Sequence, residues 1–307
     1  MRRRMVLGLA VVAAGTVIVG IAWASRQGGA GGFFSWGDPA RALAQQAAQA
    51  AAKGAWPQAA AVGARYLAEH PQGAQLDQVL CALADAYAHQ HRLIDARQAY
   101  QRVVSERPDS PLVAQAQERL GQLNIQVLFS PVVTPSDVDY DVQPGDTLTK
   151  IANQFHTTIE LLERANHLAN QTLRPQMHLK VARADFSVIV DKSQNTLTLK
   201  NGEQVLKVYH VATGKENSTP VGTFRITSRI PNPPWFTPQG VIPFGDPRNI
   251  LGTRWLGFDK PGYGIHGTSD PSSIGRQATA GCVRLTNGDA EELYTLLPLG
   301  TTVIILD

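Results

Sequence analysis

The hydrophobic period of this 307-residue chain changes along its length, and that change constrains the fold more than any other feature. Residues 38–125 are rich in alanine, and between Leu80 and Tyr87 apolar side chains recur three and four positions apart. This spacing is typical of amphipathic helices. After Asp185, apolar and polar residues alternate, as in Thr196–Lys200, which predicts strands. The chain therefore holds a helical part and a mainly β part, each long enough to bury its own core.

Two segments of the helical part repeat loosely. Residues 56–71 and 93–108 both place a helical stripe before a closing proline, Pro71 and Pro108. Helix pairs of this size that end in proline resemble tetratricopeptide-type repeats. About two such units fit within residues 38–125, fewer than repeat arrays usually need to be stable alone. The region is therefore expected to be either a groove for a protein partner or a helical spacer.

The N-terminus has the pattern of an export signal. Three arginines, Arg2–Arg4, precede an uncharged apolar stretch from Met5 to Ala24. A stretch of about 20 residues suits a transmembrane helix, whereas the sequence Ala22–Ala24 suits cleavage of a signal peptide. Residues 1–27 are therefore expected to be a membrane anchor with its arginines in the cytoplasm, or a signal peptide. Both alternatives place the rest of the chain in the cell envelope, in a periplasmic or other extracytoplasmic space beside the inner (cytoplasmic) membrane.

Composition narrows the possible partners and cofactors. The net charge is only +3 and charged residues make up 17% of the chain, which argues against nucleic acid as the main partner. The histidines are scattered, so no metal and no other cofactor is expected. The two cysteines, Cys81 and Cys282, lie in different predicted domains, which argues against a disulfide. Cys81 sits in a helical stripe as a small apolar residue, whereas a free Cys282 in an exported protein suggests a reactive thiol.

A short linker and a small module follow the helical part. Residues 126–139 break the helical pattern, and Pro131 and Pro135 predict an extended linker. Residues 139–182 predict a strand, a Pro-Gly turn, two short helices and a closing strand. This segment resembles a LysM module over its whole length, although Gln176 stands where a turn glycine is expected. The resemblance implies binding to the N-acetylglucosamine chains of peptidoglycan; the alternative is a structural module that has lost sugar binding.

Residues 185–307 predict a mainly β domain. Alternating segments, such as 186–190 and 302–306, surround one helix at about residues 287–297, which indicates a sandwich or a half-barrel. The whole chain is therefore expected to be a multidomain α+β protein. Its parts would be an N-terminal membrane or signal helix, α-helical hairpin repeats, a βααβ module and this mainly β domain.

His266 and Cys282 are the candidate catalytic pair, because both are embedded in glycine and other small residues. A thiol attacks an acyl carbon as the thiolate and needs a base or a cation beside it, which His266 would supply. No carboxylate stands beside either residue in the sequence, so the backbone carbonyl of Gly267 is the candidate to orient the imidazole. The amides of Gly281 and Cys282 are candidate donors to an oxyanion.

Three further residues are candidates for binding a substrate. Arg284 would pair with a carboxylate of the substrate or form a structural salt bridge. Trp235 lies in the proline-rich segment 232–236, which is either a lid over the substrate or a stiff surface loop. Tyr263 precedes His266 on a predicted strand, where it would either contact the substrate or pack within the sheet.

At these residues the sequence resembles the L,D-transpeptidases of the YkuD type. The likeness covers residues 186–306, with a signature of His266-Gly-Thr268, Thr279-x-Gly-Cys282 and Arg284. The resemblance implies that Cys282 attacks the third-residue carbonyl of a tetrapeptide stem in peptidoglycan and releases D-alanine. An amine of a neighbouring stem would then resolve the thioester. It also implies that His266 is the base and that the Gly267 carbonyl orients it.

Two positions depart from the family pattern. Ala280 replaces a histidine that many members carry, and Thr279 replaces the commoner serine, so positioning of the substrate by Thr279 and Gly281 is expected to differ in detail. With water as the acceptor, the same site would make the protein an L,D-carboxypeptidase or a hydrolase of a wall linkage. With a silent site, for which Ala280 is the only support, it would be a non-catalytic scaffold that binds peptidoglycan.

Overall fold

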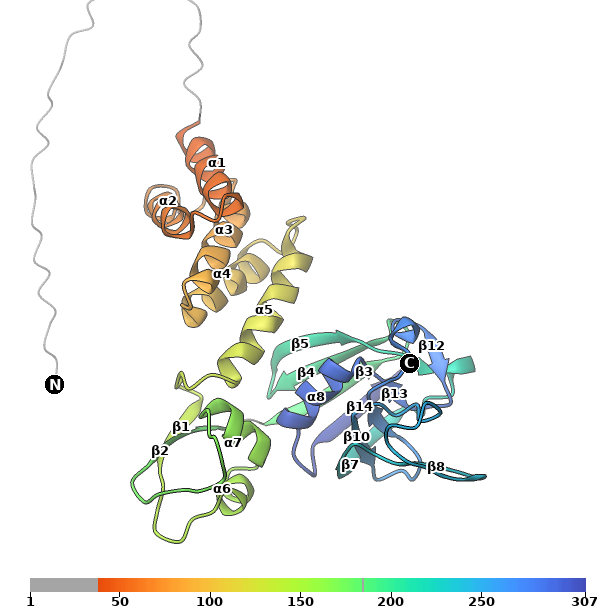
Figure 1. Ribbon diagram of the computed structural model, residues 1–307. Coiled ribbons are helices and arrows are strands. Elements are labelled where there is room, and N and C mark those ends of the chain that lie inside the picture. Colours follow the sequence, from red (N-terminus) through yellow and green to blue (C-terminus); the bar gives the residue numbers. More distant parts are fainter. Residues whose placement is uncertain (1–37, 184) are drawn as a thin grey trace, which may run out of the picture. The chain divides into compact units, whose positions relative to one another are not determined.

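Figure 1 shows the computed structural model of the chain, which describes residues 38–183 and 185–307. The predicted membrane anchor or signal peptide, residues 1–27, lies outside the described residues. Within the described part, no helix combines the length and the apolar character needed to cross a membrane. Asp38–Asp307 form one unit, in which the helical, βααβ and mainly β regions contact one another.

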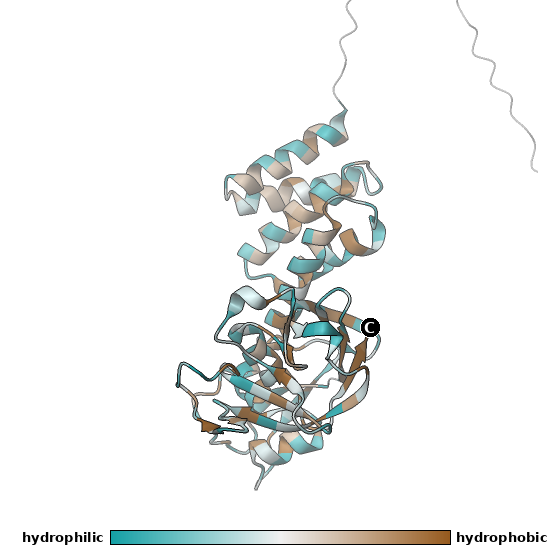
Figure 2. Cartoon of the chain, turned by 90° about the vertical axis from the view of Figure 1, so that its right-hand side faces the viewer, coloured by the Kyte–Doolittle hydropathy of each residue, from teal (hydrophilic) through white to brown (hydrophobic). Residues whose placement is uncertain are grey.

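The helical region contains α1 (Pro39–Ala52), α2 (Trp56–Glu69), α3 (Leu76–His89), α4 (Leu93–Glu106) and α5 (Val113–Leu128). The segments predicted to repeat correspond to α2 and α4. A residue before proline is disfavoured in the helical conformation, and His70 and Arg107, which precede Pro71 and Pro108, both have φ of −136°. Each helix carries both hydrophilic and hydrophobic residues (Figure 2), and the buried ones form a core rich in alanine and leucine.

The linker predicted at residues 126–139 is shorter in the structure. Helix α5 continues to Leu128, where Val127 is buried and its carbonyl accepts a hydrogen bond from the Lys180 ammonium at 2.6 Å. Strand β1 already begins at Asp137. The helix and the strand thus leave residues 129–136 between them, because contacts with residues distant in the sequence lengthen both elements beyond their local signals.

The predicted βααβ module is present. It consists of β1 (Asp137–Asp141), α6 (Leu148–Gln154), α7 (Ile159–Ala165) and β2 (His178–Ala182), with β1 and β2 antiparallel. Thr147 and Thr158 cap the two helices, since their hydroxyls accept hydrogen bonds from backbone amides of the first turn. Gln176 has φ of +68°, a left-handed conformation that costs a non-glycine residue about 1–2 kcal/mol, so the turn forms without its glycine.

Helix α7 attaches this module to the mainly β region. Leu161 and Ala165 belong to the same buried cluster as the side chains of the large sheet. The Thr158 hydroxyl also donates to the Thr295 carbonyl, and Arg229 pairs with Glu160 at 3.0 Å. These contacts show that the module is packed against the mainly β region and not merely tethered to it.

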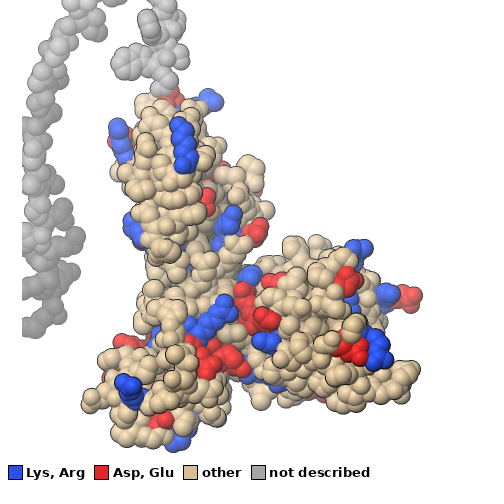
Figure 3. Space-filling view, viewed as in Figure 1, with Lys and Arg blue, Asp and Glu red and all other residues tan. Residues whose placement is uncertain are grey.

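The surface does not separate the two signs of charge. On the face seen in Figure 3, basic and acidic side chains are interspersed.

The mainly β region is built on one mixed sheet of eight strands in the order β13-β11-β10-β7-β14-β3-β4-β5. These strands are β3 (Phe186–Asp191), β4 (Thr196–Asn201), β5 (Gln204–His210), β7 (Gly222–Pro231), β10 (Arg254–Phe258), β11 (Gly264–His266), β13 (Val283–Arg284) and β14 (Thr302–Leu306). Two small pairs are added, β6 (Thr213–Gly214) with β12 (Gln277–Thr279) and β8 (Trp235–Thr237) with β9 (Gly240–Ile242). Because the main strands form one curled sheet (Figure 1), the half-barrel describes this region better than the sandwich.

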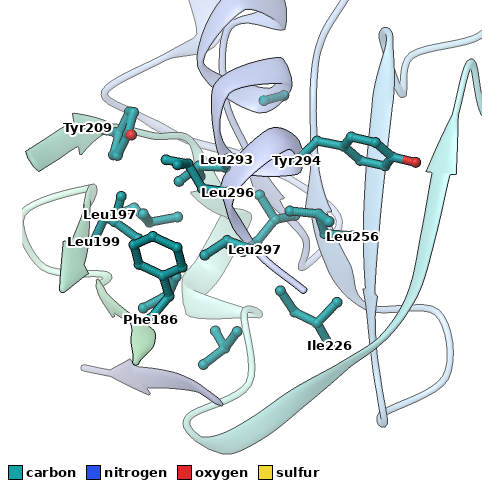
Figure 4. Close-up of a cluster of buried hydrophobic side chains, with 14 of the residues drawn as sticks. Phe186, Leu197, Leu199, Tyr209, Ile226, Leu256, Leu293, Tyr294, Leu296 and Leu297 are labelled. Carbon is teal, nitrogen blue, oxygen red and sulfur yellow. The ribbon is translucent and has the colours of Figure 1, made fainter. Parts of the chain in front are cut away.

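Helix α8 (Asn287–Leu296) packs on β10 and β11 and covers the core of the sheet. Thr286 caps this helix, because its hydroxyl accepts a hydrogen bond from the Asp289 amide at 3.1 Å. Figure 4 shows leucines of the helix beside buried side chains of the sheet, such as Leu197 and Ile226. The mainly β architecture with one helix near the C-terminus is thus confirmed.

Candidate active site

The parallel pairing of β11 with β13 brings the predicted catalytic residues together. In its register, Ile265 lies opposite Val283 and His266 lies opposite Arg284. Directly paired residues of neighbouring strands project to the same face, so His266 and Arg284 share a face of the sheet. Cys282 immediately precedes β13, and its thiol lies 3.5 Å from the carbonyl oxygen of Gly262, just before β11. The parallel pairing thus makes two segments that are separated in the sequence neighbours in the sheet.

The His266 ring is held by the backbone beside it. The residue is buried, and its Nδ1 lies 2.6 Å from the carbonyl oxygen of Gly267. A carbonyl oxygen only accepts hydrogen bonds, so Nδ1 carries the proton in the neutral ring and Nε2 holds a lone pair. This is the tautomer that a general base needs, with Nε2 as the atom that takes a proton.

Burial keeps His266 neutral. Loss of solvent and, to a smaller extent, the positive charge of Arg284 lower the pKa of the imidazole to about 4. The backbone of Gly267 and of Leu251 opposes this shift because it favours the protonated ring. At neutral pH the ring is therefore a free base rather than a cation.

The Cys282 thiol is also neutral in the resting structure. Burial raises its pKa above the ordinary value of 9.0, against the opposing effects of the Gly264 backbone and the Arg284 charge. The thiol donates to the carbonyl of Gly262, with Sγ and oxygen 3.5 Å apart. Within the described chain, no hydrogen bond joins this thiol to the His266 ring. The resting pair is thus a thiol and an imidazole, not a thiolate and an imidazolium.

Thr279 organises the loop that carries Cys282. Its hydroxyl donates to the Cys282 carbonyl at 2.7 Å and accepts from the Gly281 amide at 3.1 Å. The Gly281 amide, one of the two candidate oxyanion donors, is therefore already occupied. Gly281 has φ of +131°, and a Cβ there would lie 2.8 Å from the Tyr263 ring. The structure thus places Tyr263, Gly281 and Thr279 around Cys282 as parts of one packed loop.

Arg284 is a buried cation with unused donors. Only 8% of the residue is exposed, and its Nη1 donates to the Ser273 hydroxyl at 3.1 Å. Its Nε is buried and has no hydrogen-bond partner among the described residues. No carboxylate of residues 38–183 or 185–307 lies within 4.0 Å of its nitrogens, so the alternative of a structural salt bridge is not seen. A guanidinium in this state is suited to bind an anion.

The aromatic residue that contacts His266 is Trp255. Trp255 lies opposite His266 in the register of β10 and β11, and the two rings are stacked with centroids 5.9 Å apart. Trp235 is half-buried on β8, opposite Ile242, and no hydrogen bond or ring contact in the described chain joins it to His266 or Cys282. The prediction for Trp235 concerns contact with a substrate, and it stays a prediction.

Two glycines could have signalled the position of Trp255. A Cβ on Gly257 would lie 2.5 Å from the indole nitrogen, and one on Gly264 would lie 2.9 Å from the edge of the ring. The indole therefore lies across both positions, and only glycine leaves room for it.

In the described part of the chain, no group of three histidine, cysteine or acidic side chains is placed to hold a metal ion.

Comparison with known proteins identifies the two C-terminal domains. Residues 185–305 match the model of the YkuD L,D-transpeptidase catalytic domain, and residues 140–182 match that of the LysM domain. A Bacillus licheniformis protein named as an L,D-transpeptidase, YkuD, is 36% identical over 174 residues, which are 54% of this chain and 97% of that protein. A Bacillus subtilis protein named as an L,D-transpeptidase, YqjB, is 41% identical over 129 residues, 40% of this chain and 72% of that protein.

The chain therefore belongs to the YkuD family of L,D-transpeptidases. It carries a LysM domain directly before the catalytic domain and a helical region before the LysM domain.

Proposed function

We propose that the protein cross-links peptidoglycan as an L,D-transpeptidase, with Cys282 as nucleophile and His266 as base. The observation that supports the proposal is the register of β11 and β13, which pairs His266 with Arg284 and brings the loop of Cys282, immediately before β13, beside β11. The donor would be a tetrapeptide stem, cleaved at the carbonyl of its third residue with release of D-alanine. The acceptor would be an amine of a second stem.

The neutral state of the pair defines the first step. Because burial raises the pKa of the Cys282 thiol above its ordinary value, the thiol is protonated at neutral pH and its proton must leave as the substrate binds. Nε2 of His266 takes this proton, and Sγ forms a bond to the stem carbonyl carbon while the oxygen gains the negative charge. When the tetrahedral intermediate collapses, the carbon–nitrogen bond breaks and Nε2 returns the proton to the departing D-alanine.

The second half of the reaction repeats these roles. The acceptor amine attacks the thioester and gives its proton to Nε2, and Cys282 leaves and regains a proton from the imidazolium. Arg284 is proposed to bind a carboxylate of the stem, because its buried guanidinium has an unpaired Nε–H close to the thiol. The Cys282 amide remains the candidate oxyanion donor, since Thr279 occupies that of Gly281.

The LysM domain is proposed to hold the glycan strand of the same polymer. A surface hollow lies along residues 166–177, between α7 and β2, and includes Arg174 and Gln176. Packing of α7 against the catalytic core would fix the distance between bound glycan and the Cys282 loop. The proposed substrate lies in the cell wall, so the proposal includes an extracytoplasmic location, with residues 1–27 as anchor or signal peptide. A protein partner of the helical region also stays a proposal.

Incubation of the purified protein with tetrapeptide muropeptides, followed by mass analysis, tests the function. A cross-linked dimer that has lost one D-alanine supports transpeptidation. A tripeptide indicates water as the acceptor and hence a carboxypeptidase, and unchanged substrate indicates the scaffold. The matched variants are Cys282→Ala, which should abolish product, and Cys81→Ala, which removes the other thiol from α3 and should leave product formation unchanged. Equal activity of the two variants would refute the role of Cys282.

A further inference from the structure

We propose that Asn287 is a positioning residue for the catalytic imidazole and acts through the peptide group between Gly267 and Thr268. The inference rests on the proposed function, because it assigns a task to a residue outside the Cys–His pair of the same site. Asn287 is the first residue of α8 and does not cap that helix, since Thr286 does so.

One peptide group connects Asn287 with His266. The Oδ1 of Asn287 accepts a hydrogen bond from the Thr268 amide at 3.0 Å. The carbonyl of the same peptide group, that of Gly267, accepts from Nδ1 of His266 at 2.6 Å. The described chain has no cis peptide bonds, so the N–H and C=O of this group point in opposite directions. Asn287 therefore holds the peptide plane from the side opposite the imidazole.

The surrounding backbone is shaped to admit this side-chain oxygen. A Cβ on Gly252 would lie 2.2 Å from Oδ1, and one on Gly267 would lie 2.3 Å from it. Gly252 also has φ of +66°, which side chains rarely adopt. The same Oδ1 accepts a second hydrogen bond, from the Thr253 amide at 3.2 Å. Two glycines and two amide donors thus converge on one oxygen atom beside the peptide that orients the base.

This arrangement affects the base in two ways. It fixes the direction of the Gly267 carbonyl, and hence the rotation of the ring and the direction of Nε2. It also polarises the peptide group, because an acceptor on the N–H strengthens the hydrogen bond accepted by the C=O. A more negative Gly267 oxygen stabilises the imidazolium that forms when Cys282 loses its proton. Asn287 thereby supports, through the backbone, the role that a side-chain partner of histidine plays in other Cys–His sites.

Acylation by a carbapenem, followed by mass spectrometry of the intact protein, isolates this effect, because the small probe needs no glycan. Asn287→Ala should lower the maximal acylation rate about 10- to 100-fold, as expected when a supporting contact of a reacting group is lost. The half-saturating carbapenem concentration should change by less than about 2-fold, because Asn287 acts on the base through the backbone and would not contact the probe. Asn287→Asp keeps an acceptor oxygen in place and should stay within about 3-fold of the parent.

A second readout observes the imidazole directly. In protein with 15N-labelled histidine, the Nδ1 proton of His266 is identified by its loss in His266→Gln. Its exchange with water should be at least about 10-fold faster in Asn287→Ala and close to the parent rate in Asn287→Asp. Asn124→Ala is the matched control: it also removes a buried asparagine bonded to backbone, the Leu206 carbonyl at 2.8 Å, but lies between α5 and β5. It should change neither acylation nor exchange.

The outcomes separate this inference from the function on which it rests. Parental acylation and exchange in Asn287→Ala, with Cys282→Ala inert, would overturn the role of Asn287 and leave the function standing. Carbapenem acylation of Cys282→Ala would overturn the function itself. If Asn287→Ala does not fold, Asn287→Asp decides: parental acylation supports the inference, and a loss of 10-fold or more overturns it.

Discussion

Replacement of Thr279 by valine tests whether its hydroxyl holds the Cys282 loop. Valine has nearly the shape of threonine, so the change removes two hydrogen bonds and little else. One bond is donated to the Cys282 carbonyl at 2.7 Å, and the other is accepted from the Gly281 amide at 3.1 Å. Only 5% of Thr279 is exposed, so water does not readily replace the lost hydroxyl.

The size of the effect follows from these contacts. A buried polar group left without its partner costs about 1–3 kcal/mol. Because an amide and a carbonyl both lose their partner, Thr279→Val should lower the free energy of unfolding by about 2–4 kcal/mol. Thr279→Ser keeps the hydroxyl and loses one methyl group, which costs about 0.5–1.5 kcal/mol in a packed site.

Urea unfolding followed by tryptophan fluorescence measures both variants against the parent. Carbapenem acylation on the same samples should be slowed about 10-fold or more in Thr279→Val, because the loop no longer fixes the direction of the Cys282 thiol. It should be slowed less in Thr279→Ser. The reasoning is wrong if Thr279→Val unfolds within about 0.5 kcal/mol of the parent, or if serine and valine are equally damaging.

Two further predictions concern buried ionisable groups. The pKa of His266 is about 4 in the folded protein and 6.5 in its ordinary state, so the unfolded chain binds more protons between these values. The free energy of unfolding should therefore be retained above pH 6.5 and fall by about 3 kcal/mol as the pH drops to 4, at 1.36 kcal/mol per pKa unit. In urea unfolding, the variant His266→Gln should lack this part of the loss. An identical loss in the variant and the parent would contradict the assignment to His266. Lys180 donates to the Val127 and Ser130 carbonyls at 2.6 and 2.9 Å and lies 3.6 Å from Asp137. Lys180→Met should therefore cost about 3–5 kcal/mol in urea unfolding, and a cost below about 1 kcal/mol would show that these bonds do not hold α5 to the LysM domain.

Local sequence patterns were sufficient wherever one element and its immediate neighbours decide the structure. Prolines 71 and 108 end α2 and α4 because each restricts the residue before it. Threonines cap α6, α7 and α8 because a cap bonds amides two or three positions away. The linker was predicted less well, since Lys180, about fifty residues away, binds the end of α5.

The candidate site divides in the same way. His266 and Cys282 were found from their residue types and their small neighbours, which are chemical features of the sequence. Trp255 and Asn287 were missed because each reaches the site only by pairing of strands or packing of a helix. For Trp255, Gly257 and Gly264 were local signals, but glycine alone does not say which ring needs the space.

The sequence by itself determined the order of the parts, the family and the chemical identity of the thiol and the imidazole. Tertiary structure decided the protonation state of that pair, because burial shifts the pKa of His266 down and that of Cys282 up. It also decided which donors remain free, since the Gly281 amide is occupied and the Nε–H of Arg284 is not. Solvent exclusion and hydrogen-bond partners depend on residues that meet only in the folded chain, so no local pattern in the sequence contains them.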